Sequence, residues 1–263
     1  MHLYTLLKST ISLSFQPADT LKAQFHILNS VDSTNNYAIG RINDGLACSG
    51  EAWFTEEQTA GRGQFGKSWT SEYSANVLMS VVIEPNQALF EDQFHCNMDI
   101  SLLVRDFIQK MTSSPVLIKW PNDIYINDRK AGGTLIENKF QGKIWKWAVI
   151  GVGINVNQQH FEPDLHAVSL CSLTDEVLEP KSMAMDLHKE IIEFFQNGNK
   201  QYAEDTLTRY NRFLFRKGDE VRLMIDDMSQ LCKILEVDHK GCLNVECGGK
   251  LRKLKNGEVV WKI

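Results

Sequence analysis

The sequence lacks long apolar runs, a signal peptide and an excess of basic residues. No apolar run reaches the ~18 residues that a membrane-spanning helix needs, and the N-terminus has no basic start followed by an apolar centre and a cleavage site. Acidic residues outnumber basic ones by 33 to 28, which gives a formal net charge of −5. Proteins that bind nucleic acid through their charge are usually basic. We therefore expect a cytoplasmic protein whose partners include neither DNA nor a membrane.

The sequence also lacks the cysteine spacings of metal sites. Its six cysteines stand at positions 48, 96, 171, 232, 242 and 247, and no two of them form a Cys-x-x-Cys pair. Zinc sites usually contain such pairs, and disulfide frameworks are typical of shorter, secreted chains. We therefore expect no zinc site, and we expect reduced thiols that mostly behave as small buried hydrophobic groups.

The chain does contain enough apolar material for a core, in a regular alternation of elements. It has 263 residues, 43% of them hydrophobic, which suits one large domain and a small one. Apolar residues at helical spacing predict helices over residues 35–42, 91–111, 182–196 and 199–215. Short β-branched and aromatic runs predict strands over residues 25–28, 52–55, 76–83, 116–118, 124–126, 134–140 and 143–150. Residues 56–74 are rich in Gly, Ser and Thr and predict a long loop, which at this length is usually functional or disordered.

The pattern changes after Gly218. From there to the C-terminus, short alternating runs are separated by turn signals such as Gly248-Gly249 and Asn256-Gly257. This predicts a small all-β unit, a partly open barrel of about five strands. We therefore predict two domains, residues 1–217 and 218–263. The order of elements in the first favours an α+β fold on a mixed sheet over a doubly wound parallel sheet.

Five segments of the first domain carry residues that suit chemistry. The first, residues 58–69, reads Gln-Thr-Ala-Gly-Arg-Gly-Gln-Phe-Gly-Lys-Ser-Trp. Its glycines at 61, 63 and 66 permit positive φ and exposed amides that can surround an anion. Arg62 and Lys67 add charge suited to phosphate or carboxylate, although the spacing is not that of a Walker A loop. The alternative is a surface turn with solvated basic side chains.

The second segment, residues 119–123, reads Lys-Trp-Pro-Asn-Asp. Pro121 interrupts the hydrogen-bonding ladder between two strands and predicts a kink or bulge. Asn122 and Asp123 offer oxygen ligands for Mg²⁺ or hydrogen bonds to a nucleotide, beside the positive charge of Lys119. The alternative is a simple Asx-type turn.

The third and fourth segments combine glycines with a polar side chain. In residues 130–133, Lys-Ala-Gly-Gly, the lysine lies next to exposed backbone and can stabilise charge that develops on a phosphate; a hairpin turn is the alternative. Residues 151–155, Gly-Val-Gly-Ile-Asn, lack the third glycine of a dinucleotide-binding fingerprint. We expect these glycines to let a ligand approach the strand closely, with Asn155 facing that ligand.

The fifth segment, residues 32–35, reads Asp-Ser-Thr-Asn at the start of a predicted helix. Hydroxyl side chains in this position usually cap the helix. The alternative is that Ser33 and Thr34 form hydrogen bonds with a polar ring of a small molecule.

Each segment alone is a weak signal, but together and in this order they resemble the biotin protein ligase family. That family's pattern is Ser-Thr-Asn, Gln-x-x-Gly-Arg-Gly, Lys-Trp-Pro-Asn-Asp, Lys-x-x-Gly and Gly-x-Gly-Ile-Asn. This sequence meets it at residues 33–35, 58–63, 119–123, 130–133 and 151–155. The resemblance implies a catalytic domain similar to class II aminoacyl-tRNA synthetases, followed by an SH3-like barrel at the C-terminus.

The resemblance also implies an activity in two half-reactions. Biotin and Mg·ATP give biotinyl-5′-AMP and pyrophosphate, and the biotin then passes to one lysine of a biotin carboxyl carrier protein. The expected substrates are therefore biotin and ATP, with Mg²⁺ as the metal ion and the carrier as the protein partner. Nothing before Phe25 is similar to the DNA-binding domain of some members, so we expect no regulatory role. A homodimer stays open.

The resemblance assigns roles to individual residues. The catalytic candidates are Lys130 and Arg62. The biotin-binding candidates are Ser33, Thr34, Asn35, Gln58, Gly61, Arg62, Gly63, Gln64, Lys130, Gly132 and Gly133. The candidates for ATP and the adenylate are Arg62, Trp69, Lys119, Asn122, Lys130, Ile154 and Asn155, and those for Mg²⁺ are Asn122 and Asp123. Gln64 replaces a second arginine that some members have, which lowers the charge available to hold the adenylate.

Three alternatives stay open. A lipoate ligase would share the catalytic fold and the acyl-adenylate chemistry, but it needs a longer apolar channel and no partners for a ureido ring. An aminoacyl-tRNA synthetase would need a basic surface for tRNA. A non-enzymatic binding module built on residues 219–263 would leave the Lys/Arg-Gly segments without a purpose.

Overall fold

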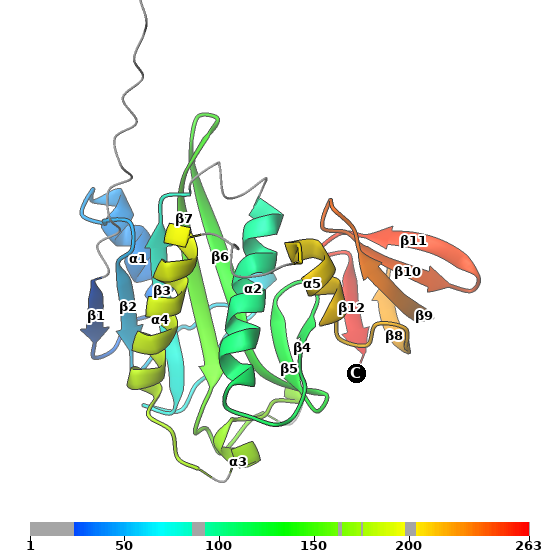
Figure 1. Cartoon of the computed structure of the whole chain (residues 1–263), viewed down its shortest axis with the longest axis horizontal. Coiled ribbons are helices and arrows are strands. Elements are labelled where there is room, and N and C mark those ends of the chain that lie inside the picture. Colours follow the sequence, from blue (N-terminus) through cyan, green and yellow to red (C-terminus); the bar gives the residue numbers. More distant parts are fainter. Residues whose placement is uncertain (1–23, 86–92, 163–164, 175, 198–203, 263) are drawn as a thin grey trace, which may run out of the picture.

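The protein contains two separate β-sheets (Figure 1). The computed structural model describes residues 24–85, 93–162, 165–174, 176–197 and 204–262. The larger sheet has seven strands in the order β1-β2-β3-β7-β6-β5-β4, and β1 and β2 are parallel whereas the other neighbours are antiparallel. Its strands are β1 (Phe25–Leu28), β2 (Ala52–Thr55), β3 (Asn76–Ile83), β4 (Val116–Lys119), β5 (Asp123–Ile126), β6 (Arg129–Gln141) and β7 (Ile144–Asn155). The prediction of a mixed α+β fold is confirmed.

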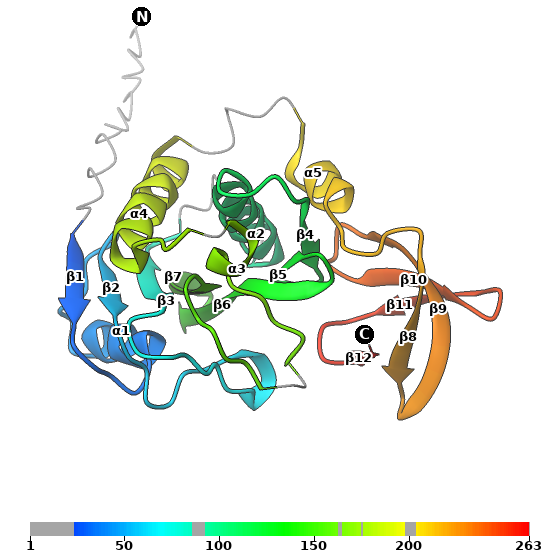
Figure 2. The ribbon, with the colours of Figure 1, turned by 90° about the horizontal axis from the view of Figure 1, so that it is seen from below.

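Helices cover both faces of the larger sheet. Figure 2 shows α2 and α4 on one face and α1 on the other. The helices are α1 (Thr34–Asn43), α2 (Gln93–Gln109), α3 (Cys171–Thr174), α4 (Pro180–Asn197) and α5 (Thr206–Arg212). Among the described residues, no helix is long and apolar enough to cross a membrane.

The core packs against both faces of β3, which lies next to β7, the central strand of the larger sheet. All eight residues of β3 are buried, as expected for a continuous apolar run covered on both faces. On one face its side chains join the main hydrophobic cluster with α2 and α4, and on the other Val82 joins a smaller cluster with Ala38 of α1. The face with α1 is only partly covered, and this leaves room for a cleft.

The second sheet has five antiparallel strands in the order β11-β10-β9-β8-β12. Its strands are β8 (Glu220–Ile225), β9 (Met228–Val237), β10 (Leu243–Cys247), β11 (Lys250–Leu254) and β12 (Val259–Lys262). We call it the C-terminal sheet. The prediction of about five short strands after Gly218 is confirmed.

The C-terminal sheet is joined to the rest of the protein by buried hydrogen bonds. The indole of Trp120 donates to Gly241 O at 3.1 Å. The side-chain amide of Asn211 donates to Val237 O at 2.8 Å and accepts from Val237 N at 2.7 Å. Buried polar groups that satisfy each other in this way fix relative orientation, so the sheet is held beside α5 and the start of β5.

Several predicted boundaries were wrong. The strands predicted at 134–140 and 143–150 extend to 129–141 and 144–155, because their glycine-containing ends also pair in the sheet. The helix predicted over 199–215 ends at Arg212, and its first five residues lie outside the described part of the chain. It ends there because Ile118 of β4 accepts from Phe215 N and donates to Phe213 O, each at 2.8 Å.

Candidate functional site

A cleft of about 1030 Å³ lies on the α1 side of the larger sheet. Its walls come from α1, β6, β7, the β4–β5 hairpin, β12 and residues 58–69, which we call the glycine-rich loop. The sequence-predicted site residues that line it are Ser33, Thr34, Asn35, Gln58, Arg62, Gly63, Gln64, Trp69, Lys119, Asn122, Asp123, Lys130 and Gly133. Segments that are far apart in the sequence therefore meet in one place.

Four predicted site residues do not line the cleft: Gly61, Gly132, Ile154 and Asn155. Successive strand residues face opposite sides of a sheet. Ile154 packs in the main hydrophobic cluster, and a Cβ on Gly132 would lie 3.7 Å from Ile108 of α2, so both face the α2 side of the sheet. The Asn155 side-chain amide is instead used within the fold, where it donates to Lys130 O at 3.1 Å and to Val168 O at 3.3 Å.

A buried polar network forms one end of the cleft. Both the backbone N and the hydroxyl of Thr34 donate to Gln58 Oε1, at 2.8 and 3.1 Å. Ser80 of β3 lies 2.7 Å from the Thr34 hydroxyl and donates to Asn35 Oδ1 at 2.6 Å. Ser33 occupies the N-cap position of α1, but its side chain makes no capping bond. The capping prediction for these hydroxyls is therefore wrong, and they belong to the cleft.

Arg62 is paired with an acidic residue that the sequence analysis did not single out. Its guanidinium contacts Glu137 of β6 at 3.0 and 3.1 Å and donates to Asn36 Oδ1 at 2.7 Å. The same carboxylate accepts from the side-chain amide of Asn35 at 2.8 Å. Arg62 therefore lies at the edge of the polar network, and Glu137 compensates its charge.

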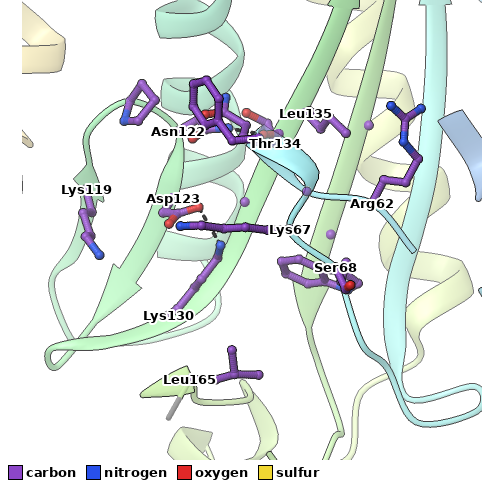
Figure 3. A pocket seen from close by; sticks show the side chains of 18 of the residues that line it. Arg62, Lys67, Ser68, Lys119, Asn122, Asp123, Lys130, Thr134, Leu135 and Leu165 are labelled. Atoms are coloured by element: carbon purple, nitrogen blue, oxygen red, sulfur yellow. Dashed lines mark hydrogen bonds and ion pairs between the residues drawn. The ribbon is translucent and has the colours of Figure 1, made fainter. Parts of the chain in front are cut away.

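Lys130 lies at the centre of the cleft, at the start of β6. Its Nζ is 2.6 Å from Asp123 Oδ1 and 5.4 Å from the centre of the Trp69 ring. Its backbone is fixed on the other side, because Lys130 N donates to His166 O at 2.7 Å and Lys130 O accepts from Val168 N at 2.9 Å. Lys67 of the glycine-rich loop points toward the Lys130–Asp123 pair (Figure 3).

Lys119 is held in an aromatic corner between the two sheets. Its Nζ lies 3.1 Å from the Tyr125 hydroxyl, 5.0 Å from the Tyr125 ring centre and 5.6 Å from the Trp261 ring centre. Burial lowers the pKa of Lys119 to about 8; Asp123 opposes the shift, and Lys130 and Lys67 add to it. Burial also raises the pKa of Tyr125 well above its ordinary value, so this hydroxyl stays protonated.

The cleft is positive although the whole chain is negative. The charged residues that line it are Arg62, Lys67, Lys119, Lys130 and Lys262 against Asp123 and Glu162, whereas the chain carries a net charge of −5. Three buried polar atoms on its wall, Trp69 Nε1, Thr134 Oγ1 and Trp261 Nε1, have no hydrogen-bond partner among the described residues. Such groups are costly unless a ligand or water satisfies them, so the cleft suits an anionic, hydrogen-bonding ligand.

The second segment forms the hairpin between β4 and β5, with a cis bond between Trp120 and Pro121. The side-chain amide of Asn122 donates to Thr134 O, which leaves its carbonyl oxygen for a ligand. One oxygen of Asp123 is taken by Lys130. Among the described residues, no group of three or more His, Cys, Asp or Glu side chains is placed to hold a metal ion.

The glycine-rich loop differs from the predicted anion nest. Only Gly66 of its three glycines has a positive φ, at 74°, together with Phe65 at 53°. Gly63 N donates to Lys67 O at 2.7 Å and Lys67 N donates to Gln64 O at 3.1 Å, so both amides are used within the loop. Gly61 is required because a Cβ there would collide with Trp69 O. The expectation of positive φ at residues 61 and 63 was therefore wrong.

The glycines of β7 make room for the protein's own side chains. A Cβ on Gly151 would collide with the amide of Asn35, and one on Gly153 would lie 2.7 Å from the Trp69 ring. The predicted close approach to the strand is real, but in this structure Asn35 and Trp69 make it. They form part of the cleft wall.

Sequence reasoning missed several residues of the cleft and its network: Ser80, Glu137, Tyr125, Asn256 and Trp261. Ser80 and Glu137 stand in the middle of predicted strands and carry no local signal. Trp261 and Asn256 belong to the C-terminal sheet and its last turn, which had no motif. Alternation along β5 could have placed Tyr125 on the same face as Asp123.

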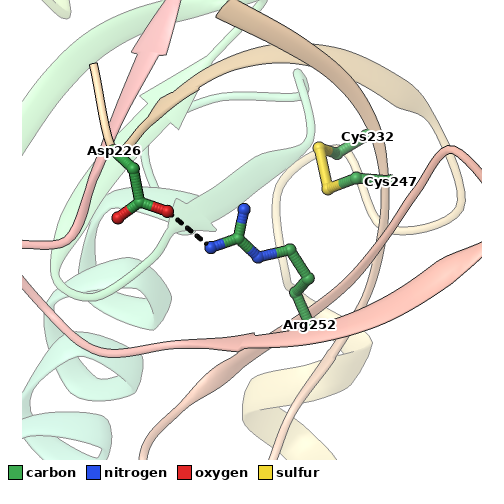
Figure 4. The surroundings of a disulfide bond; sticks show 4 residues. All are labelled: Asp226, Cys232, Cys247 and Arg252. Carbon is green, nitrogen blue, oxygen red and sulfur yellow. Dashed lines mark hydrogen bonds and ion pairs between the residues drawn. A yellow bond between two sulfur atoms is a disulfide. The ribbon is translucent and has the colours of Figure 1, made fainter. Parts of the chain in front are cut away.

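The cysteines lie away from the cleft, and two of them correct the sequence prediction. Cys232 of β9 and Cys247 of β10 form a disulfide (Figure 4). They are directly opposite each other in the strand register, and no spacing rule shows such a pairing in the sequence. The expectation of reduced thiols was therefore wrong for Cys232 and Cys247, whereas the other four cysteines are free. Half of the six are buried, namely Cys96, Cys232 and Cys247.

Comparison with known proteins identifies related sequences along most of the chain. A model of the biotin/lipoate A/B protein ligase family matches residues 27–155. The bifunctional ligase/repressor BirA of Escherichia coli K12 is 30% identical over 237 residues, which cover 89% of this chain and 72% of that protein. A biotin–[acetyl-CoA-carboxylase] ligase of Mycobacterium tuberculosis is 28% identical over 244 residues, which cover 90% and 88% of the two chains.

Solved structures share the fold. The biotin protein ligase from Aquifex aeolicus in complex with biotin and ATP superposes with a TM-score of 0.72 at 24% sequence identity. The superposition covers 91% of this chain and 98% of that one. The similarity therefore extends over both sheets.

Proposed function

This chain belongs to the biotin/lipoate A/B protein ligase family, and we propose that it is an ATP-dependent biotin protein ligase. It forms biotinyl-5′-AMP from biotin and ATP and transfers the biotin to a lysine of a biotin carboxyl carrier protein. The Mycobacterium relative is named for this reaction on acetyl-CoA carboxylase, and the Aquifex structure contains biotin and ATP. These names support biotin and ATP as the substrates.

The observation that carries the proposal is the convergence of four motifs on one positive cleft. Ser33, Gln58, Lys119 and Lys130 come from α1, the glycine-rich loop, β4 and β6, and all line the same cavity. A cavity of about 1030 Å³ is large enough for a vitamin and a nucleotide, since ligand pockets are usually about 300–1,000 Å³.

We assign the polar end of the cleft to the ureido ring of biotin. A ureido group presents a carbonyl acceptor and two N–H donors, and it requires both kinds of partner. The Ser33 and Thr34 hydroxyls and the Gln58 amide supply donors and acceptors at this end. Leu78, Met79 and Val152 line the adjoining wall, which suits the apolar thioether ring and the acyl chain.

Lys130 is the catalytic candidate for adenylate formation. The biotin carboxylate attacks the α-phosphorus of ATP, a P–O bond forms, and the bond to pyrophosphate breaks. Negative charge moves onto the bridging and leaving oxygens, where a positioned ammonium lowers the barrier. Lys130 is suited to this because its backbone is fixed on both sides, while Asp123 Oδ1 orients its Nζ at 2.6 Å.

The second half-reaction breaks the bond that joins the acyl group to AMP. The uncharged ε-amine of the carrier lysine attacks the acyl carbonyl and an amide bond forms. The C–O bond to AMP breaks, AMP leaves with its electron pair, and the proton lost by the amine passes to the departing phosphate or to solvent. Arg62 is our second catalytic candidate, because it belongs to the glycine-rich loop and lies at the edge of the polar network in the cleft. It can exchange Glu137 for the phosphate of the adenylate.

We propose that Mg²⁺ enters as Mg·ATP. This ion usually binds one or two protein carboxylates together with substrate phosphates and water. Asn122 Oδ1 and the second oxygen of Asp123 fit that demand, because the other polar atoms of both side chains are engaged by Thr134 and Lys130. The ion would compensate charge on the phosphates; Lys67, Lys119 and Lys130 orient them.

The finer description of the fold is part of the same proposal. We assign the seven-stranded sheet to a class II aminoacyl-tRNA synthetase-like catalytic domain and the C-terminal sheet to an SH3-like barrel, with the boundary at residues 217–218. The absence of a DNA-binding role stays a prediction, since residues 1–23 lie outside the described part of the chain. A homodimer stays open.

The proposal is tested by biotin-dependent exchange of pyrophosphate into ATP, followed by labelling of an apo carrier domain. We expect exchange with biotin, none without it, and label on a single carrier lysine after ATP is added. Exchange that does not depend on biotin would reject adenylate formation.

Lipoate is the second candidate substrate, because the matching family includes lipoate ligases. The same exchange assay with lipoate in place of biotin separates the two. We expect about five- to 150-fold lower kcat/KM with lipoate, because donors and acceptors at the Thr34–Gln58 end of the cleft that lose their ligand partner cost ~1–3 kcal/mol. A higher value with lipoate would reassign the substrate.

A further inference from the structure

The tip of the glycine-rich loop touches the last turn of the C-terminal sheet. The side-chain amide of Asn256 donates to Gln64 Oε1 at 3.2 Å, across 192 residues of sequence. One residue further along each segment, the Phe65 ring lies against Gly257, where a Cβ would be 3.0 Å from Phe65 Cε1. Figure 2 shows the loop beside the turn that leads into β12.

Phe65 holds an unusual backbone conformation, and its partner Gly257 holds one that glycine adopts readily and other residues do not. Phe65 has φ 53° in the short 3-10 turn Gln64–Gly66, and its side chain is 67% exposed. Gly257 has φ 95° in a turn closed by Glu258 N donating to Lys255 O at 3.0 Å. A positive φ is unfavourable for a non-glycine residue, and an exposed aromatic ring gains little from solvent. The backbone of Phe65 therefore directs its ring to the turn, where the ring contacts Gly257.

The contact lies on the cleft itself. Gln64, Phe65, Asn256 and Gly257 all line it, and β12 continues from the turn to place Trp261 over Lys119. We infer that Gln64 and Phe65 form a latch with Asn256 and Gly257 that holds the glycine-rich loop against the C-terminal sheet and slows the escape of the acyl-adenylate. These are positioning residues, because they act through the loop and not on the reacting atoms.

The latch also gives Gln64 a purpose in this chain. Glutamine carries no charge that could hold a phosphate, but its side-chain oxygen accepts from Asn256. This hydrogen bond joins the glycine-rich loop to the last turn of the C-terminal sheet, so it restrains the position of the loop. The part of this inference that concerns the adenylate rests on the proposed function; the contact between loop and turn does not.

The first test is independent of any ligand. Hydrogen exchange of the amides in residues 61–68 is measured in the full-length protein and in Asn256→Ala, Gly257→Ala and Gly249→Ala. Gly249 is the matched control, because it also has positive φ, at 75°, in a turn of the same sheet, but a Cβ there meets nothing within 4 Å. We expect faster exchange in the first two variants and wild-type exchange in the control.

The second test measures release of biotinyl-5′-AMP made from biotin and Mg·ATP. Asn256→Ala should raise the release rate by about two- to tenfold, the factor for one hydrogen bond of ordinary strength. In a Gln64→Ala background the same change should add nothing, because its partner is already gone. A purely structural role for Asn256 would instead give additive effects.

The outcomes separate the two claims. Equal exchange and equal release in Asn256→Ala, Gly257→Ala and Gly249→Ala overturn the latch and leave the ligase assignment intact. A wild-type protein that makes no biotinyl-5′-AMP overturns the proposed function, and the exchange measurement still decides whether the latch exists. Gly257→Ala can lose thermal stability because alanine is strained at this positive φ. In that case Asn256→Ala decides the question, because it changes no backbone conformation.

Discussion

The two sheets contribute to the same cleft in different ways. The larger sheet and its loops supply residues from recognisable motifs, such as Lys119 and Lys130, whereas the C-terminal sheet supplies Asn256 and Trp261 from a segment without any motif. The first set suits chemistry at a fixed point. The second set contacts the glycine-rich loop and Lys119 from the other sheet. The difference teaches that a site can be recognised from one unit of a chain and still be incomplete without the other.

The strongest test of this division is Lys130→Ala. We expect single-turnover formation of biotinyl-5′-AMP to slow by roughly 10²–10³-fold, the scale for loss of one transition-state charge stabiliser. Rapid quench with labelled ATP measures the step directly. An unchanged rate would remove Lys130 from its role and with it the assignment of chemistry to the larger sheet.

A smaller effect is expected from Arg62→Gly. Loss of a charged hydrogen-bond donor costs ~1.5–3 kcal/mol, so the release rate of the adenylate should rise by about ten- to a hundredfold. Arg62→Lys serves as the control, since it keeps the charge. If release stayed the same in Arg62→Gly, retention would belong to the latch alone.

Lys119 connects the two units, and its titration sharpens the comparison. Because burial lowers its pKa to about 8, the ammonium is charged below that pH and loses its charge above it. We expect kcat/KM for ATP, which reports on the free enzyme, to fall with rising pH above about 8 and to approach a tenfold loss per pH unit. The charged and titratable groups that face Lys119 are Asp123, Lys130, Lys67 and Tyr125. Lys119→Arg should abolish the decline. A decline that persists unchanged in Lys119→Arg would reject the assignment to Lys119.

The smallest effect is expected from the C-terminal sheet. Trp261→Ala removes a ring 5.6 Å from Lys119 Nζ, and such cation–π contacts are worth ~0.5–1 kcal/mol. The KM for ATP should rise by about two- to fivefold, and the pH decline should move upward as Lys119 is uncovered. Leu251→Ala, on an exposed position of β11, should change neither value. If Trp261→Ala has the same KM and pH profile as Leu251→Ala, the C-terminal sheet does not contribute to ATP binding.

The sequence predicted most of the fold because the larger elements have simple periodicity. The strands β1, β2 and β3 have the predicted bounds. The ends of β6 and α5 were wrong because pairing with distant segments, such as Ile118 with Phe213 and Phe215, overrides local preference. The disulfide between Cys232 and Cys247 was missed for the same reason, since it follows from strand register.

The site was predictable to the extent that its residues share motifs. The cleft brings together, as expected, Ser33, Gln58, Lys119 and Lys130. The side-chain amide of Asn155 instead donates hydrogen bonds within the fold. Glu137 could not be foreseen, because nothing near it in sequence indicates that Arg62 lies opposite. A motif indicates which side chains come together, but the pairing of Arg62 with Glu137 depends on how the glycine-rich loop folds beside β6.

Two of the cations in the cleft already have an anion of their own: Asp123 beside Lys130 and Glu137 beside Arg62. An anionic ligand that binds Lys130 or Arg62 must therefore compete with a carboxylate that is part of the protein and cannot diffuse away. Monovalent ions of the solvent, such as chloride or acetate, offer only one weak contact in exchange. A nucleotide triphosphate offers several contacts at once, so it competes with these two carboxylates better than a monovalent ion of the solvent does.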